Sequence, residues 1–274
     1  MSPIGASLYP FDLDTLALAR LGQEAEVRGF DSVFVVEQGV SNDGMAAVEA
    51  IALATSRIAL GPGIANVHLR HPALLGATAV AVDELSGGRL ILGLGTNNET
   101  MIRGLGLPWK EPRLALREAT GWVRRVFAGQ APPGIHTAFR AARRPIPIHF
   151  GGVALETAAL AGEIADGLML YLATPARARQ MIDRVTGAAR RAARAPDAVQ
   201  ITLLVPTFVS DRLDAARAAA RVFLARYAGR PLYAKMFRRS GFDAEAEAMA
   251  AALTRGDAAG AVAAVSDRML DEVL

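Results

Sequence analysis

Residues 83–99 read DELSGGRLILGLGTNNE, and this stretch decides the fold. A helical pattern ends in the turn Ser86-Gly87-Gly88, and a short apolar run then stops at Gly93-Leu94-Gly95. Small polar or charged residues, Thr96 to Glu99, follow directly. A continuous apolar run is typical of a buried parallel strand, and barrel enzymes place their chemistry in the loop after such a strand. We therefore expect a strand that ends in a ligand-binding loop, where glycines let a ligand approach the backbone.

Strand-like runs alternate with helical patterns on both sides of this stretch. The predicted strands are 4–8, 32–36, 57–63, 89–95, 146–150, 167–171 and 199–209. Such alternation indicates a parallel sheet covered by helices, and its seven repeats favour a (β/α) barrel over an open sheet. From Arg230 onward the pattern is helical, with breaks at Gly241 and Gly256. We expect one barrel domain over 1–274, with a helical segment at about 230–274 in place of the last unit.

Composition excludes several classes of protein. A chain of 274 residues with 52% apolar composition can bury a large core as one domain. The absence of cysteine excludes disulfides and thiolate metal sites, and the four histidines do not have metal-ligand spacing, so no metal is expected. No targeting pattern or membrane-spanning run is present, which predicts a cytoplasmic protein with no membrane partner.

The positive charge of the chain does not indicate a nucleic-acid partner. The net charge is +3, and Lys110 and Lys235 are the only lysines. The densest basic stretch, Arg184 to Arg194, lies in an alanine-rich helical pattern without interleaved aromatic residues. This pattern is typical of a solvated helix face, so we expect no nucleic-acid binding.

Two enzyme motifs are absent at the places where they would matter. Gly93-x-Gly95 invites a dinucleotide-binding interpretation, but Asn98 replaces the third glycine. No helix is predicted at this turn, because Pro108 and Pro112 mark a long loop before the next helix. A Gly-x-Ser-x-Gly elbow is also absent, so hydrolase chemistry has no support.

Three other strand ends carry candidate site residues. The loop after the third strand contains His68, a candidate to face a ligand, and His71, which is placed to cap the next helix. Glu37 closes the second strand and is either a general acid or base or the partner of a nearby arginine. His149, within the fifth strand, is expected to be a core residue. Backbone N–H groups at 151–154, before a helix, favour anion binding, although close packing also explains the glycines there.

Together these segments resemble the luciferase-like flavin monooxygenase superfamily, and more closely its deazaflavin-dependent branch, which is similar to methylene-tetrahydromethanopterin reductase. The order and spacing of several segments carry the resemblance. They are 29–33 with Glu37, 54–72, 83–95, 104–109 and 145–167.

The resemblance implies a (β/α)8 barrel with the cofactor ring at the carboxyl ends of the strands. It implies a cis peptide bond between Gly63 and Ile64 that buttresses the ring. It also implies a phosphate site on the backbone of Gly152, Val153 and Ala154. The polar ring and tail contacts that it implies are Glu37, Asn66, Thr96 and Asn97.

The sequence departs from the family pattern in three ways. Gln38 stands where some members have a catalytic histidine, and Asn98 aligns near their catalytic glutamate. Glu99 fills that role only if the loop shifts by one residue, so Glu37, His68, Asn98 and Glu99 are all candidate catalytic residues. Relatives continue past the motif at 269–274 into an eighth strand and helix. Either the chain is truncated, or a partner or its own last helices cover the unpaired edges.

The resemblance leads to a functional hypothesis with two alternatives. The leading one is an oxidoreductase that transfers a hydride between the deazaflavin coenzyme F-420 and a small organic substrate. The first alternative is an FMN-dependent monooxygenase, and the second is a non-catalytic flavin-binding relative. The resemblance also implies a homodimer. The loop Gly129 to Arg144 and the region after Arg230 are expected to shape the substrate pocket.

Overall fold

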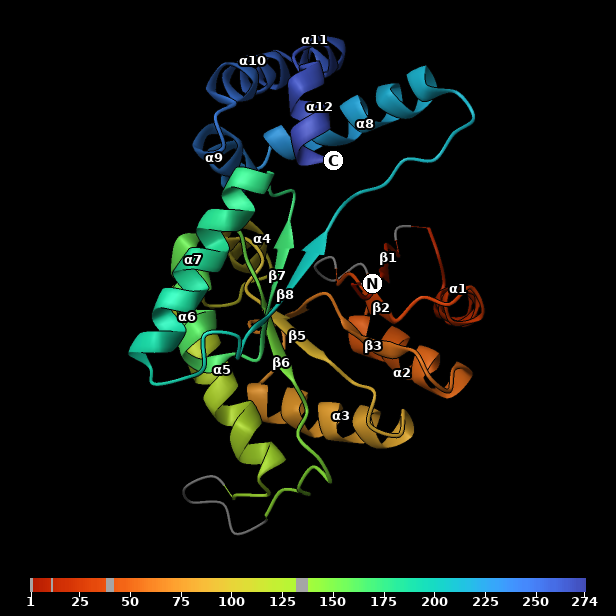
Figure 1. The fold of residues 1–274 in the computed structure, drawn as a ribbon, viewed down its shortest axis with the longest axis vertical. Helices are drawn as coiled ribbons and strands as arrows, with labels where there is room; N and C mark the ends of the chain where they lie inside the picture. Colours follow the sequence, from red (N-terminus) through yellow and green to blue (C-terminus); the bar gives the residue numbers. More distant parts are fainter. Residues whose placement is uncertain (1, 11, 38–41, 132–137) are drawn as a thin grey trace. The chain divides into compact units, whose positions relative to one another are not determined.

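The computed structural model describes residues 2–10, 12–37, 42–131 and 138–274. They fall into two compact units, which we name the barrel unit and the helical unit (Figure 1). The barrel unit comprises Met1–Gly152, Glu156–Met169 and Val185–Thr202. The helical unit comprises Val153–Leu155, Leu170–Arg184 and Leu203–Leu274. Whether the chain behaves as one domain stays a prediction.

The strands form a partial parallel barrel. One sheet has the order β1-β2-β3 and the other the order β4-β5-β6-β7-β8. The strands are β1 (Gly5–Leu8), β2 (Ser32–Val35), β3 (Ala59–Pro62), β4 (Ala65–Asn66), β5 (Leu92–Gly95), β6 (Ile148–Gly151), β7 (Gly167–Tyr171) and β8 (Gln200–Leu204). An isolated parallel bridge between Leu60 and Leu90 joins the two sheets. Among the described residues no pairing joins β1 to β8, so the predicted barrel without its closing unit is confirmed.

The predicted third strand, 57–63, is divided in the structure into β3 and β4. The peptide bond between Gly63 and Ile64 is cis, as the resemblance implied. Before it, the Gly63 N–H still donates to the Val35 carbonyl of β2, at 2.8 Å. After it, Ala65 and Asn66 pair with β5 instead. The chain therefore changes its partner strand at this bond, and the sequence pattern, apolar on both sides, does not reveal the change.

The glycines of β5 and β6 make room for the Ile64 side chain. A Cβ atom added at Gly95 would lie 2.5 Å from Cδ1 of Ile64, and one at Gly151 would lie 2.6 Å from its Cγ2. A Cβ atom at Gly93 would lie 2.1 Å from the carbonyl oxygen of Pro62. Glycine within a strand often marks such a close approach. The glycines at 93 and 95 therefore leave room for Pro62 and Ile64, which lie against β5.

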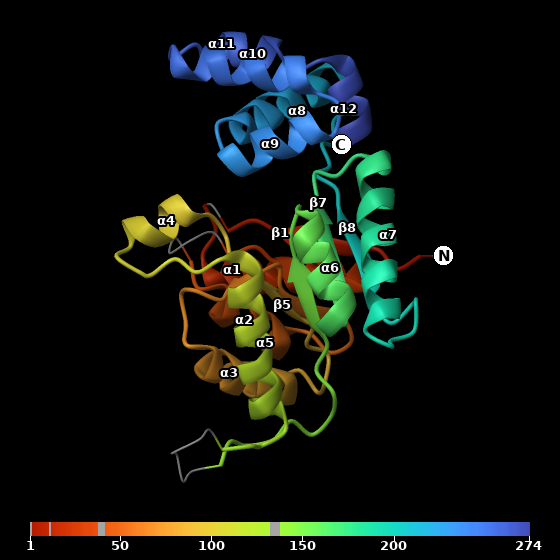
Figure 2. The same ribbon diagram turned by 90° about the vertical axis from the view of Figure 1, so that its left-hand side faces the viewer.

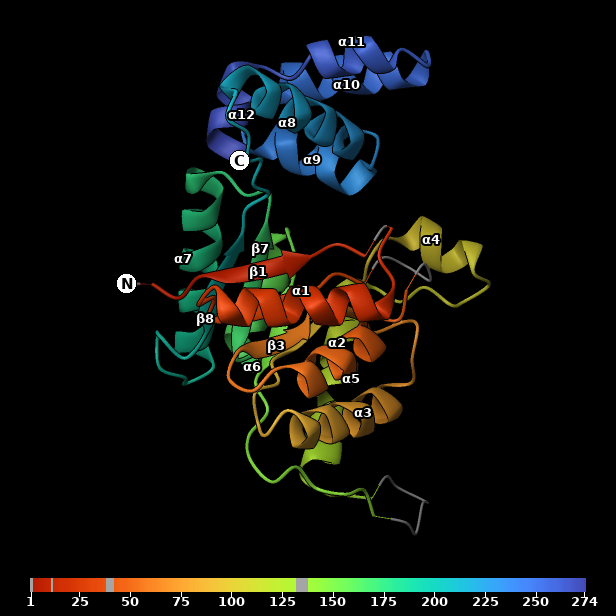
Figure 3. The ribbon, with the colours of Figure 1, turned by 90° about the vertical axis from the view of Figure 1, so that its right-hand side faces the viewer.

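Helices pack in sequence around the barrel unit. α1 packs on α2, α2 on α3 and α3 on α5 (Figure 3). The bounds of these helices are α1 (Thr15–Val27), α2 (Gly44–Ala54), α3 (Pro72–Leu85) and α5 (Pro112–Phe127). Two helices further along the chain, α6 (Leu155–Ile164) and α7 (Pro175–Arg191), each have residues in both units. His71 caps α3 as predicted, because its Nδ1 accepts the Ala73 N–H at 3.2 Å. Among the described residues, no helix has the length and apolarity needed to cross a membrane.

The loop predicted between β5 and Pro112 contains a short helix, so that part of the prediction was wrong. Helix α4 (Glu99–Gly104) begins directly after Asn98. The Asn98 side chain accepts the Met101 N–H at 2.9 Å and so caps the helix. Asparagine is a favoured residue at this position, but a segment of one to two turns is too short to show a helical pattern in the sequence.

The helical unit forms its own core from the last five helices (Figure 2). They are α8 (Leu213–Ala228), α9 (Pro231–Arg239), α10 (Asp243–Thr254), α11 (Ala258–Ala263) and α12 (Asp267–Val273). Phe237, Phe242 and Met249 are completely buried in this core. The predicted breaks at Gly241 and Gly256 are confirmed, and both glycines have positive φ angles, 86° and 74°. Left-handed backbone of this kind favours glycine after a helix.

We predict that Gly93→Ala strongly destabilises the barrel unit. The new Cβ atom would meet a backbone oxygen, which cannot move aside as a flexible side chain can. The free energy of unfolding should fall by about 2 kcal/mol or more, measured by urea denaturation. Gly121→Ala in α5 is the matched control, because a Cβ atom there meets nothing within 4 Å. Equal effects of the two substitutions would contradict this account of Gly93.

Candidate functional site

Glu37 lies just after β2 and is held by two donors. Its side chain is 1% exposed, and its Oε2 accepts from Nη1 of Arg70 at 2.9 Å. Its Oε1 accepts the backbone N–H of Asn66, the last residue of β4, at 3.0 Å. Of the two interpretations of Glu37 left open by the sequence, the structure shows the ion pair with an arginine. A direct role of Glu37 toward a cofactor stays a prediction.

Arg70 connects this carboxylate to the start of α2. Its Nη2 lies 2.5 Å from Oδ1 of Asp43, which caps α2 by accepting the N–H groups of Met45 and Ala46. Burial alone lowers the pKa of Arg70, but its hydrogen bonds to Glu37 and Asp43 outweigh that effect and raise it. Burial likewise raises the pKa of Asp43, yet the hydrogen bond from Arg70 and those from the helix backbone bring it below its usual value. The sequence shows an arginine in the loop after the third predicted strand, but no sequence pattern indicated which carboxylates it would bind.

Asn66 carries a buried amide group with unused hydrogen-bonding capacity. The residue is 1% exposed, and its Oδ1 accepts the His68 N–H at 2.9 Å. Its Nδ2 has no hydrogen-bond partner within the part of the chain that the structure describes. A buried polar group without a partner costs about 1–3 kcal/mol, so such groups call for an explanation. An oxygen or nitrogen atom of a bound ligand would satisfy this donor, and the site therefore fits a polar cofactor ring.

In the loop after β5, the candidate side chains of Asn97 and Asn98 form hydrogen bonds with the backbone of their own segment. Asn97 has a positive φ of 56°, and its Oδ1 accepts from the backbone N–H of Asn98 at 2.9 Å. Glu99 is exposed and forms an ion pair with Arg103, one turn further along α4. Asn98 is occupied as the cap of that helix. Roles of Thr96 and Asn97 in cofactor contact, and of Asn98 and Glu99 in catalysis, stay predictions.

His68 packs against the segment that leads into α5. Its imidazole ring stacks on Trp109, with centroids 4.7 Å apart and planes inclined by 15°. Its Nε2 lies 3.3 Å from the carbonyl oxygen of Lys110. Burial lowers the pKa of His68, and contacts with the backbone of Lys110 and Thr96 offset this only in part. The ring is therefore neutral near pH 7.

The predicted phosphate site shows evidence of close packing. The Gly152 N–H already donates to the Met169 carbonyl at 3.3 Å. A Cβ atom at Gly152 would lie 2.6 Å from Cγ2 of Thr157, which explains why glycine stands there. Val153 and Ala154 belong to the helical unit, whereas Gly152 belongs to the barrel unit. A phosphate site on these three residues therefore stays a prediction.

Some predicted positions lie outside the described residues. Gln38, which stands where some family members have a catalytic histidine, is one of them. Part of the predicted substrate loop, 132–137 within Gly129 to Arg144, is another. Among the residues that are described, no cluster of three or more His, Asp or Glu side chains has a metal-binding arrangement.

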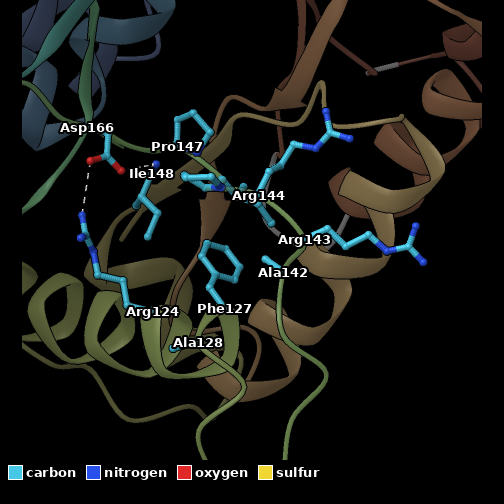
Figure 4. Close-up of a pocket in the computed structure, with 11 residues that line it drawn as sticks. Arg124, Phe127, Ala128, Ala142, Arg143, Arg144, Pro147, Ile148 and Asp166 are labelled. Atoms are coloured by element: carbon cyan, nitrogen blue, oxygen red, sulfur yellow. Dashed lines mark hydrogen bonds and ion pairs between the residues drawn. The ribbon is translucent and has the colours of Figure 1, made fainter.

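A cavity of about 620 Å³ lies away from these residues, at the amino end of β6 (Figure 4). Phe127, Ile148 and Arg144 contribute to its lining. Arg124, also in the lining, points toward Asp166, whose Oδ1 is 3.4 Å from its Nη2. Barrel enzymes use the opposite, carboxyl ends of their strands for chemistry. The cavity is therefore no part of the candidate site.

His149 is buried in the core, as predicted, but it is not a fully hydrogen-bonded core histidine, because its Nδ1 has no partner among the described residues. It is 1% exposed, and its ring lies 2.5 Å from the position of a Cβ atom on Gly167, so the imidazole packs directly on that glycine. Burial lowers the pKa of His149 to about 4, although the charge of Asp166 opposes the shift. The buried imidazole is neutral over the physiological range.

Comparison with known proteins places this architecture in a family. The family described as luciferase-like monooxygenase matches residues 12–274, and the chain belongs to it.

Its relatives include the 5,10-methylenetetrahydromethanopterin reductases of two archaea. The protein of Methanolobus tindarius is 27% identical, over 97% of this chain and 84% of that protein. The protein of Archaeoglobus fulgidus is 29% identical, over 90% of this chain and 78% of that protein. Among solved structures, the coenzyme F-420-dependent tetrahydromethanopterin reductase of Methanopyrus kandleri has a TM-score of 0.83 and 25% identity, and the match covers 99% of this chain and 85% of that one. The similarity extends over nearly the whole chain.

We predict that Arg70→Met lowers the free energy of unfolding by about 3 kcal/mol, because it leaves the Glu37 carboxylate buried without its ion-pair partner. Adding Glu37→Gln should recover part of the loss. Arg103→Met is the control, since it breaks an ion pair whose two side chains are more than half exposed. That loss should stay below about 1 kcal/mol. Urea denaturation measures all four proteins, and equal losses for the two arginine variants would contradict the assignment.

We predict that His149 makes stability depend on pH. Its pKa is about 4 in the folded state and 6.5 without burial, so between these values the unfolded chain takes up the proton more readily. Its contribution is fully present above pH 6.5 and is lost as the pH falls toward 4. The loss is on the order of 3 kcal/mol. His149→Phe should flatten this part of the profile of unfolding free energy against pH. An unchanged slope would show that another group is responsible.

Proposed function

We propose that the protein is an oxidoreductase that transfers a hydride between coenzyme F-420 and a small organic substrate. The observation that carries the proposal is the buried, unpartnered amide of Asn66 at the carboxyl end of β4. It lies in a chain that matches an F-420-dependent reductase structure along nearly its full length. The match to proteins named as F-420-dependent favours this cofactor over FMN. The relatives that the chain resembles along most of its length are named as reductases, which favours an enzyme over a non-catalytic relative.

Different residues would take different parts of cofactor binding. Glu37 and Arg70 fix the loop that follows β4, so that Asn66 presents its Nδ2 donor in a constant position. Ile64 would contribute an apolar surface toward the deazaflavin ring, and Thr96 and Asn97 would supply polar contacts. The backbone of Gly152, Val153 and Ala154 would hold the phosphate. When bound, the deazaflavin itself supplies the carbon that accepts or donates the hydride.

A proton donor is needed only if the substrate takes up a proton along with the hydride. Glu99 is the candidate of this chain, because it is a carboxylic acid close to the end of β5, at the start of α4. Its ion pair with Arg103 is exposed and therefore weak, and Glu99 would have to leave this pair and take up a proton from solvent before it could donate one to a substrate.

The protein is further proposed to act as a homodimer in the cytoplasm. The resemblance to the family supports this proposal, and several large apolar side chains are exposed on α1, α2 and α3, where a second copy would cover them. They include Leu16, Val27, Leu53 and Leu74. Neither a membrane nor a nucleic acid is proposed as a partner.

We predict that coenzyme F-420 binds to the purified protein, while FMN binding is not measurable. The test is a titration with each cofactor, followed by fluorescence. Asn66→Ala should weaken F-420 binding about tenfold, since it removes one hydrogen bond to the ring. Gln23→Ala, which removes an exposed amide on α1, is the control and should bind normally. Thermal unfolding verifies that each variant is folded. Tight FMN binding without F-420 binding would overturn the proposal.

A further inference from the structure

The segment 96–111, which we name the mouth loop, carries several candidate site residues but has little packing of its own. It contains Thr96, Asn97, Asn98 and Glu99, and then helix α4. Within the described structure, Ile102 is the fully buried side chain of α4, and most of its neighbours are exposed. β5 holds the beginning of the loop through its pairing with β4 and β6. At the far end, Glu111 caps α5 by accepting the N–H groups of Arg113 and Leu114, and one further contact lies beside this cap.

That contact is the stack of His68 on Trp109. The two rings are nearly parallel, at 15°, with centroids 4.7 Å apart. Next to Trp109, the backbone of Lys110 lies on the edge of the imidazole, with its carbonyl oxygen 3.3 Å from Nε2. The far end of the mouth loop is therefore attached to the residues that follow β4.

His68 is itself rigidly placed. Its backbone N–H donates to Oδ1 of Asn66, and the Asn66 N–H donates to Glu37. A chain of hydrogen bonds thus runs from the buried Glu37 carboxylate to the backbone of His68, whose ring stacks on Trp109. Each of these groups therefore orients the next one along the chain of hydrogen bonds.

The same contacts make His68 a poor proton donor. Its ring face is covered by Trp109, and its Nε2 is occupied by the Lys110 backbone. Burial also lowers its pKa, so little of the protonated form exists at neutral pH. The sequence made His68 a candidate catalytic residue, whereas its surroundings suit a structural task.

We propose that His68 and Trp109 form a clamp that fixes the mouth loop over the carboxyl ends of the strands, and that His68 is a positioning residue for Thr96 and Asn97. The kinetic consequence rests on the proposed function, but the clamp itself does not. The backbone of Thr96 contacts the His68 ring, so when the clamp opens this support for Thr96 and its neighbour Asn97 is lost, and the cofactor or substrate binds less well. The ion pair of Lys110 with Glu118 is exposed and adds little to the closure.

The two lysines of the chain provide a direct test of the clamp. A lysine-specific protease can cut only after Lys110, within the mouth loop, and after Lys235, within α9. Cleavage in a folded protein follows the population of the locally opened form. Loss of an aromatic pair of this kind should speed cleavage at Lys110 about two- to twelvefold in Trp109→Ala or His68→Ala. Cleavage at Lys235 should not change and is the internal control.

Two further variants separate the clamp from general damage. Trp109→Phe keeps an aromatic face for His68 and should keep cleavage at Lys110 close to the wild-type rate. Trp122→Ala removes the other tryptophan, which contacts His71 edge-on at 5.4 Å, and should leave cleavage at Lys110 unchanged. Unchanged cleavage in both Trp109→Ala and His68→Ala would overturn the clamp, whether or not the protein binds F-420.

Kinetics then test the positioning role. Trp109→Ala and His68→Ala should raise KM by a similar factor with a smaller effect on kcat, and the double variant should be no worse than either single one. The dependence of kcat/KM on pH should keep its shape in both. If His68→Ala instead lowered kcat and altered the pH profile while Trp109→Ala did neither, His68 would be an acid or base and the positioning role would be wrong.

Discussion

The packing of Ile64 against the glycines of β5 and β6 is the constraint on which the rest of the site depends. Side-chain atoms of Ile64 lie within 2.6 Å of the places where Cβ atoms on Gly95 and Gly151 would be. A side chain at either position would collide with Ile64, and one at Gly93 would collide with the backbone oxygen of Pro62, which cannot move aside. Asn66 and His68 follow Ile64 closely in the chain, so this contact contributes to their placement. Gly95 and Gly151 thus serve the site by having no side chain, which leaves space for Ile64.

A buried electrostatic network fixes the same segment from the other side. The Glu37 carboxylate, the Arg70 guanidinium and the capping carboxylate of Asp43 connect β2, the loop after β4 and the start of α2. Charges as buried as Glu37 are tolerated only when they are paired and hydrogen-bonded. The network therefore holds the carboxyl ends of the strands in one arrangement. This rigidity suits an enzyme in which the cofactor carries the chemistry and the protein supplies orientation.

Much of the fold could be predicted because its signals are local. The alternation of strands and helices, the cap at His71 and the helix breaks at Gly241 and Gly256 each depend on a few adjacent residues. The helix after Asn98 was missed because a helix of one to two turns has too few residues for a periodic pattern. The contact of His68 with Trp109 was not foreseen because nothing near His68 in the sequence specifies a distant aromatic partner.

The sequence by itself determined the parallel barrel, the positions of the two glycine breaks in the helical unit, and the family. These features depend on hydrophobic periodicity and on the spacing of glycines, prolines and polar residues at strand ends, which can be read directly from the order of residues. Only the tertiary structure decided what the site residues do. It paired Glu37 with Arg70, left the Asn66 amide buried without a partner among the described residues, and placed His68 beneath Trp109. The physical reason is that the role of a polar side chain depends on its burial and its partners, and both arise when distant segments pack together.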